Sequence, residues 1–107
     1  MTTFDDRERA FETKFARDDD MIFRATARRN RLVGRWAAEK LGLSAEEADA
    51  YSKAVVAADL EEAGDEDVIR KVMGDFAAGQ IDVSEAELRA MLAEKAAEAR
   101  QQLMDEG

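Results

Sequence analysis

Residues 67–92 read DVIRKVMGDFAAGQIDVSEAELRAML and contain the body of one helix, its end and the start of the next. Apolar residues recur at helical spacing in the first half of this stretch, at Val68, Ile69, Val72, Met73 and Phe76. Gly79 then marks a helix end. Ser84 with Glu87 has the spacing of a capping box, which starts another helix. The stretch therefore predicts two consecutive helices joined by a short loop.

The same signals recur upstream and predict two more helices. A second capping box, Ser44 with Glu47, starts a helix that we expect to end near Gly64. An earlier helix is expected over about 21–41, with Asp20 as its N-cap and Gly42 just beyond its end. No segment shows the alternation typical of strands. The sequence thus predicts an all-α, four-helix bundle-like domain over residues 20–107, and its mid-stripe tryptophan, Trp36, is expected at the centre of the core.

The amino-acid composition and net charge exclude several classes of function. The chain has 107 residues and contains no histidine, cysteine or proline, so conventional catalytic triads, disulfides and thiolate metal sites are excluded. We therefore expect a protein that is not an enzyme, with no catalytic residues, no metal and no cofactor. The net charge of −9 argues against a nucleic-acid partner. No apolar run approaches the roughly 20 residues that span a bilayer, so we expect a cytoplasmic protein without direct membrane insertion.

Residues 1–19 form a candidate N-terminal arm. Phe4, Phe11 and Phe15 are spaced i, i+7 and i+11, so a helix would place three rings on one face. Such a face suits a groove on another protein. The consecutive aspartates 18–20 have poor helix propensity and repel one another, which predicts a hinge and a mobile arm in the free protein. The alternative is that the three rings pack on the parent bundle as a fifth helical piece.

A basic stripe follows the arm, in a segment (21–43) with six basic residues, one acidic residue and a net charge of +5. The stripe consists of Arg24, Arg28, Arg31 and Arg35, spaced i, i+4, i+7 and i+11 along one helix face. These arginines either offset the acidic helices of the same chain or bind an anion, such as a nucleotide phosphate or an acidic protein surface. Arg29 points elsewhere and is expected to bury its stem and pair with a carboxylate of another helix.

Several motifs together resemble the ATPase inhibitor zeta subunit family of α-proteobacterial ATP synthases. They are the opening MTTFDDRERAFE-x-KFA (1–16), Ala27-Arg28-Arg29-Asn30, Gly34-x-Trp36-Ala37-Ala38, Gly42-Leu43, Gly64-Asp65-Glu66-Asp67-Val68 and the 82–87 start of the last helix. The resemblance implies a four-helix bundle whose mobile N-terminal segment enters a catalytic α/β interface of the F1 sector and blocks rotation in the ATP-hydrolysing direction.

Carried onto this chain, the resemblance implies that the inhibitory segment runs from Met1 to about Arg17. Its expected partner-binding residues are Phe4, Arg7, Arg9, Phe11, Lys14 and Phe15. The implied partners are the α, β and γ subunits of F1-ATPase, and the implied location is the cytoplasm, in peripheral association with the membrane-bound ATP synthase. The alternative function is a small helical bundle that binds an anionic ligand weakly, such as ADP or ATP, on the basic stripe.

Overall fold

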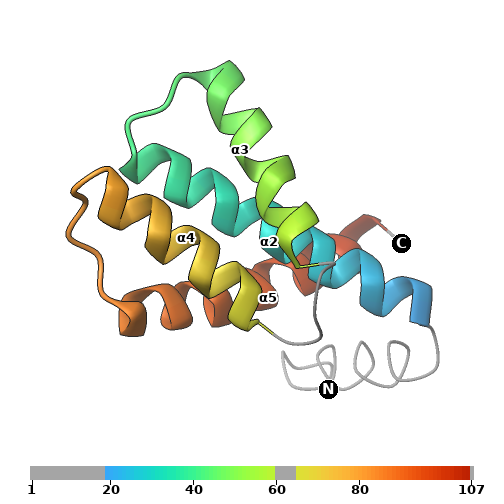
Figure 1. Ribbon diagram of the computed structural model, residues 1–107. Coiled ribbons are helices and arrows are strands. Elements are labelled where there is room, and N and C mark those ends of the chain that lie inside the picture. Colours follow the sequence, from blue (N-terminus) through green and yellow to red (C-terminus); the bar gives the residue numbers. More distant parts are fainter. Residues whose placement is uncertain (1–18, 60–64, 107) are drawn as a thin grey trace.

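The computed structural model describes residues 19–59 and 65–106, and within these ranges the chain is all-α. Four helices are present there: α2 (Asp19–Lys40), α3 (Ala45–Ala58), α4 (Glu66–Ala78) and α5 (Glu85–Glu106). Helix α2 packs against both α3 and α5, and the end of α5 lies beside the first half of α2 (Figure 1). The predicted all-α, four-helix architecture is confirmed.

The predicted caps hold the turn between α2 and α3. Gly42 has a positive φ of 73°, and the Leu43 N–H donates to the Ala38 carbonyl at 3.0 Å, which is the pattern of a Schellman motif. Ser44 then forms a full capping box with Glu47: each side chain accepts a hydrogen bond from the other residue's backbone N–H. The hydrogen bond from the Ser44 N–H lowers the pKa of the Glu47 carboxyl.

Two helix boundaries differ from the prediction. Helix α2 already includes Asp19, so Asp20 lies in its first turn and is not the N-cap. Helix α3 ends at Ala58, well before Gly64. Asp59 follows as the C-cap of α3, and its carboxylate lies 3.9 Å from Arg29 on α2, a contact between helices that the helical pattern does not contain.

The core has a main cluster and a small satellite. The main cluster draws on all four helices and has Phe76, Leu88, Val33, Val55, Val68 and Val72 among its fully buried side chains. The satellite consists of Leu103 and Met104 on α5 with Met21 and Ala25 on α2. Trp36 was expected at the centre of the core, and this was wrong. The indole is only partly buried and packs edge-to-face on Phe76, with ring centroids 5.8 Å apart, because Phe76 occupies the central position.

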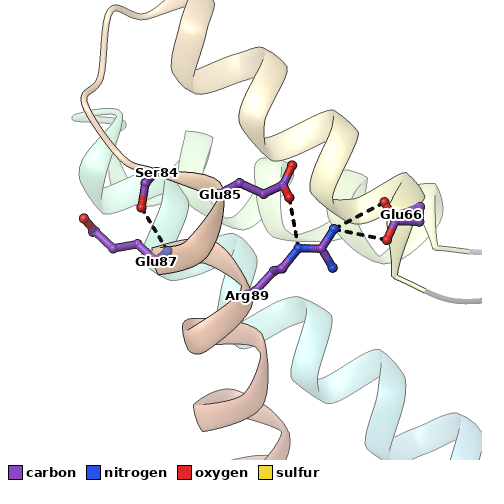
Figure 2. Close-up of polar contacts among 5 residues, drawn as sticks. All are labelled: Glu66, Ser84, Glu85, Glu87 and Arg89. Carbon is purple, nitrogen blue, oxygen red and sulfur yellow. Dashed lines mark hydrogen bonds and ion pairs between the residues drawn. The ribbon is translucent and has the colours of Figure 1, made fainter.

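Arg89 connects the starts of α4 and α5. Its guanidinium donates to Glu85 on its own helix at 3.1 Å and to Glu66 on α4 at 3.2 Å (Figure 2).

The Ser84 hydroxyl accepts from the Glu87 N–H at 3.1 Å and so caps the start of α5. This contact confirms the predicted helix start.

Candidate functional site

The predicted partner-binding residues of the arm lie outside the residues that the structure describes. This concerns Phe4, Arg7, Arg9, Phe11, Lys14 and Phe15. The structure does describe the point where the arm joins the bundle, since α2 begins at Asp19. We therefore build the site from this junction.

A groove opens beside the first half of α2. It has a volume of about 430 Å³ and lies between α2, α3 and α5. We call it the basic groove, and the described residues that line it are Phe23, Arg24, Ala27, Arg28, Arg31, Lys53, Val56, Leu103 and Glu106. Three of the four arginines in the predicted stripe lie together here, whereas Arg35, one turn further along α2, does not line it.

The fold explains why α3 contributes to the groove. A Cβ atom built on Gly34 would lie 2.7 Å from the Cα atom of Ser52, so α2 and α3 approach each other closely at this point. The neighbouring Lys53 and Val56 on α3 are thereby carried to the side of α2 that bears Arg28 and Arg31. On the other side, Leu103 anchors α5 on the satellite cluster.

The groove combines an exposed aromatic ring with positive charge. Phe23 is 56% exposed and its neighbour Ile22 is 44% exposed; these are the exposed large hydrophobic residues in the described part of the chain. Phe23 lines the groove, but Ile22 does not. An exposed phenylalanine beside four basic side chains is an arrangement suited to binding, because ring burial and charge pairing both gain on contact with a partner.

Carboxylates of the same chain already pair with three of the four cations. Arg24 contacts Asp20 at 3.1 Å, and Lys53 contacts Asp49 at 3.1 Å, each within one helix. Arg28 reaches across to α5 and donates to Glu106 from both terminal nitrogens of its guanidinium, one of them at 3.0 Å. Arg28 thus offsets an acidic residue of another helix, as the intramolecular interpretation expects, whereas Arg24 pairs within α2.

Arg31 and Arg35 are different. Both are exposed, and within residues 19–59 and 65–106 neither has a carboxylate at ion-pair distance. They still act on Asp49: the hydrogen bond and charge of Lys53 lower the pKa of that carboxyl most, and the charges of Arg31 and Arg35 lower it further. Arg31 is therefore the cation of the groove that is most available to an added anion.

Sequence reasoning missed the other six residues that line the groove, and Phe23 and Lys53 are the two that matter most for binding. Phe23 carries a local signal, since it precedes Arg24 and lies four residues before Ala27 on the same side of the helix. Lys53 carries none, because its position depends on how α3 crosses α2.

A second polar cluster surrounds Arg29, as predicted. Its side chain is only 13% exposed, contacts Asp65 at 2.8 Å and Asp59 at 3.9 Å, and donates to the Asn30 side-chain oxygen. Asp59 follows α3 and Asp65 precedes α4, so one guanidinium holds the end of one helix beside the start of the next. This cluster stabilises the fold.

Two further classes of site were checked in the described ranges. No group of three or more carboxylates there is placed to hold a metal ion. None of the helices in the same part of the chain combines the length and apolar character that crossing a membrane requires.

Comparison with known proteins agrees with the resemblance seen in the motifs. The model of the family described as ATPase inhibitor subunit zeta matches residues 1–102. A solved structure, described as "Solution NMR structure of the protein", is 54% identical, with a TM-score of 0.73 over 81% of this chain and 99% of that chain. No curated protein matches the chain. Because the family model covers both the arm and nearly all of the bundle, the chain belongs to the ATPase inhibitor subunit zeta family.

Proposed function

We propose that this protein inhibits ATP hydrolysis by the F1 sector of an ATP synthase and that residues 1–19 are the inhibitory element. The match of the family model from residue 1 onward carries the proposal, since it includes the whole arm. In this proposal, residues 20–107 form a separate helical domain that holds the arm in place.

The mechanism needs no chemistry by the inhibitor. Catalytic α/β interfaces of F1 close around nucleotide during turnover, and a helix seated in one of them resists that closure. Phe4, Phe11 and Phe15 share one helical face, and buried aromatic side chains usually dominate the energy of an interface. Arg7, Arg9 and Lys14 flank this face and would steer association with the α, β and γ subunits.

The direct test is ATP hydrolysis by the cognate F1 sector at increasing concentrations of the full chain. The full chain should inhibit, and a variant lacking residues 1–19 should not. Replacing Phe4, Phe11 or Phe15 singly by alanine should weaken inhibition about thirtyfold, corresponding to about 2 kcal/mol. Lys14→Gln should instead alter mainly the association rate and its salt dependence. Full inhibition by the truncated chain would show that the arm is not the inhibitory element.

The alternative of an adenine nucleotide on the basic stripe remains a separate prediction. It draws support from Arg31 and Arg35, which have no paired carboxylate in the described part of the chain. Titration with ADP or ATP at low ionic strength should then shift amide signals along α2, and added salt should reverse the shift. Unchanged spectra would leave only the intramolecular role for the stripe.

In the cell, the proposed site of action is the cytoplasmic face of the membrane-bound ATP synthase. The protein would be held there by F1 and not by lipid. Sedimentation of the protein with membranes should therefore require the F1 sector, and membranes stripped of F1 should leave it in the supernatant.

A further inference from the structure

We propose that the basic groove is a second contact with the F1 sector and that it receives an acidic segment of an F1 subunit bearing an apolar side chain. This inference rests on the proposed function, but it concerns a different surface from the arm. The arm would block closure, and the groove would add affinity and fix the direction in which the arm leaves the bundle.

The position of the groove is the first argument. Phe23 lies four residues after Asp19, the first residue of α2, which corresponds to about 6 Å along the helix axis. In Figure 1 the blue start of α2, where the arm joins, lies beside the red end of α5, which supplies Leu103 and Glu106 to the groove. An arm seated in an F1 crevice therefore brings this end of the bundle against the F1 surface.

The exposed ring is the second argument. Phe23 is 56% exposed although Ala27 and Leu103 line the same groove. Covering the ring against these neighbours would remove apolar surface from water on both partners. Large aromatic side chains of this kind are the residues that most often dominate binding energy. The groove therefore calls for an apolar side chain on the partner.

The charges of the groove residues indicate that the partner segment is acidic. Of the described residues that line the groove, four are basic and one, Glu106, is acidic, in a chain with a net charge of −9. In the pairs Arg24–Asp20 and Lys53–Asp49 the side chains are 47–67% exposed, and such pairs contribute little. Partner carboxylates can replace them at small cost and can also occupy the available guanidinium of Arg31.

A second copy of this chain is a poorer occupant than an F1 subunit. Two copies that each carry −9 repel one another. In the proposed mechanism the arm of the second copy also sits in an F1 crevice, and it would have to leave that crevice to bring its own bundle to this groove. An acidic F1 segment beside the same crevice can enter the groove while the arm stays in place.

Two pairs of variants of the full chain test the groove. Phe23→Ala is matched by Ile22→Ala, since both remove an exposed large apolar side chain from α2 but only Phe23 lines the groove. Arg31→Glu is matched by Lys40→Glu, since both reverse an exposed charge on α2 and Lys40 lies at the far end of the helix. Circular dichroism and melting curves of all four variants should resemble those of the parent chain.

The measured quantities are the concentration for half-inhibition of F1 and the residual activity at saturation. Phe23→Ala should raise the half-inhibition concentration about tenfold, and Arg31→Glu about fivefold at low salt, with a smaller effect at high salt. Inhibition at saturation should stay complete, because the arm is intact. The two controls should stay within twofold of the parent chain.

The outcomes separate this inference from the proposed function. If the parent chain does not inhibit F1, the proposed function fails. If it inhibits and all four variants match it, only the groove inference fails. A separate cross-linking experiment identifies the occupant of the groove, with Phe23 replaced by the photo-reactive residue p-benzoylphenylalanine. Cross-linking to an acidic segment of an F1 subunit supports the inference, whereas cross-linking to a basic segment or to a second copy of the chain overturns it.

Discussion

At the scale of single residues, Gln80 adopts a left-handed backbone conformation that is unfavourable for a residue with a side chain. It has a positive φ of 58°, and the Ile81 N–H beside it donates to the Phe76 carbonyl at 2.8 Å, which closes α4 with a Schellman motif. The glycine expected to end this helix, Gly79, has an ordinary φ of −85°. The motif therefore places a glutamine where glycine has the lowest conformational cost.

Replacing Gln80 with glycine should stabilise the protein. Relief of the left-handed strain, offset in part by the greater entropy of the unfolded chain, should leave a gain of about 0.5 kcal/mol. Urea denaturation measures this gain as a higher midpoint at an unchanged slope. Gln101→Gly in the body of α5 is the control and should destabilise by about 1 kcal/mol. If both variants lost stability, the strain at Gln80 would not be significant.

Gly34 and Gly74 form a second matched pair, both within helices. A Cβ atom on Gly34 would meet the Ser52 backbone at 2.7 Å, whereas one on Gly74 would meet nothing within 4 Å. Gly34→Ala should therefore force α2 and α3 apart and cost about 1–3 kcal/mol. Gly74→Ala should add about 0.5–1 kcal/mol of stability, because alanine is the better helix former. Equal effects of the two substitutions in urea denaturation would contradict the close packing of α2 on α3.

At the scale of elements, Tyr51 and Asp75 join α3 to α4. The tyrosine hydroxyl donates to a carboxylate oxygen of Asp75 at 2.7 Å, and Lys71 lies 5.1 Å from the ring centroid. Burial, and then the hydrogen bond and charge of Asp75, raise the pKa of Tyr51. An acid with a raised pKa in the folded state stabilises the fold below its unfolded pKa of about 10, and that contribution is lost as pH rises further.

This link can be measured directly, because Tyr51 is the single tyrosine of the chain. Absorbance of the tyrosinate should appear near pH 10 in denaturant and only at clearly higher pH in the native protein. Tyr51→Phe should cost about 1 kcal/mol at neutral pH through the lost hydrogen bond, and its stability should fall less steeply above pH 10 than that of the parent. A native tyrosine that titrates near pH 10 would show that the hydroxyl is not held.

How far the elements could be predicted depended on whether their signals were local. The turn at Gly42 and Ser44 was predicted correctly, since a glycine and a capping box determine it within a few residues. The end of α3 was not, because Asp59 after its last residue contacts Arg29 on α2, and that contact depends on how the helices pack. Two further features depend on how the helices cross, and helical spacing contains no information about that crossing. One is that Phe76, and not Trp36, is central in the core. The other is that Lys53 lines the same groove as Arg28 and Arg31.

At the scale of the whole molecule, the arm and the bundle have different tasks in the proposed function. The bundle contains two polar systems: the Arg29 cluster holds α3 and α4 together, and the basic groove remains open to a partner. In the same proposal, the arm supplies the inhibition. The sequence predicted this division from the spacing of the phenylalanines and the acidic hinge, but it could not predict the groove, because three helices build it.

The final prediction is that the bundle is stable without the arm. Every described residue of the two core clusters lies between Met21 and Met104, so deleting residues 1–19 removes none of these. The truncated chain should melt cooperatively, within about 5 °C of the parent, since 1 kcal/mol shifts the melting temperature of a domain this size by about 4–8 °C. Differential scanning calorimetry of both chains measures the difference. A drop of more than 10 °C would instead mean that Phe4, Phe11 and Phe15 pack on the bundle as a fifth helical piece. The arm would then have to detach from the bundle before it could enter F1, and its affinity for F1 would be reduced by the cost of that detachment.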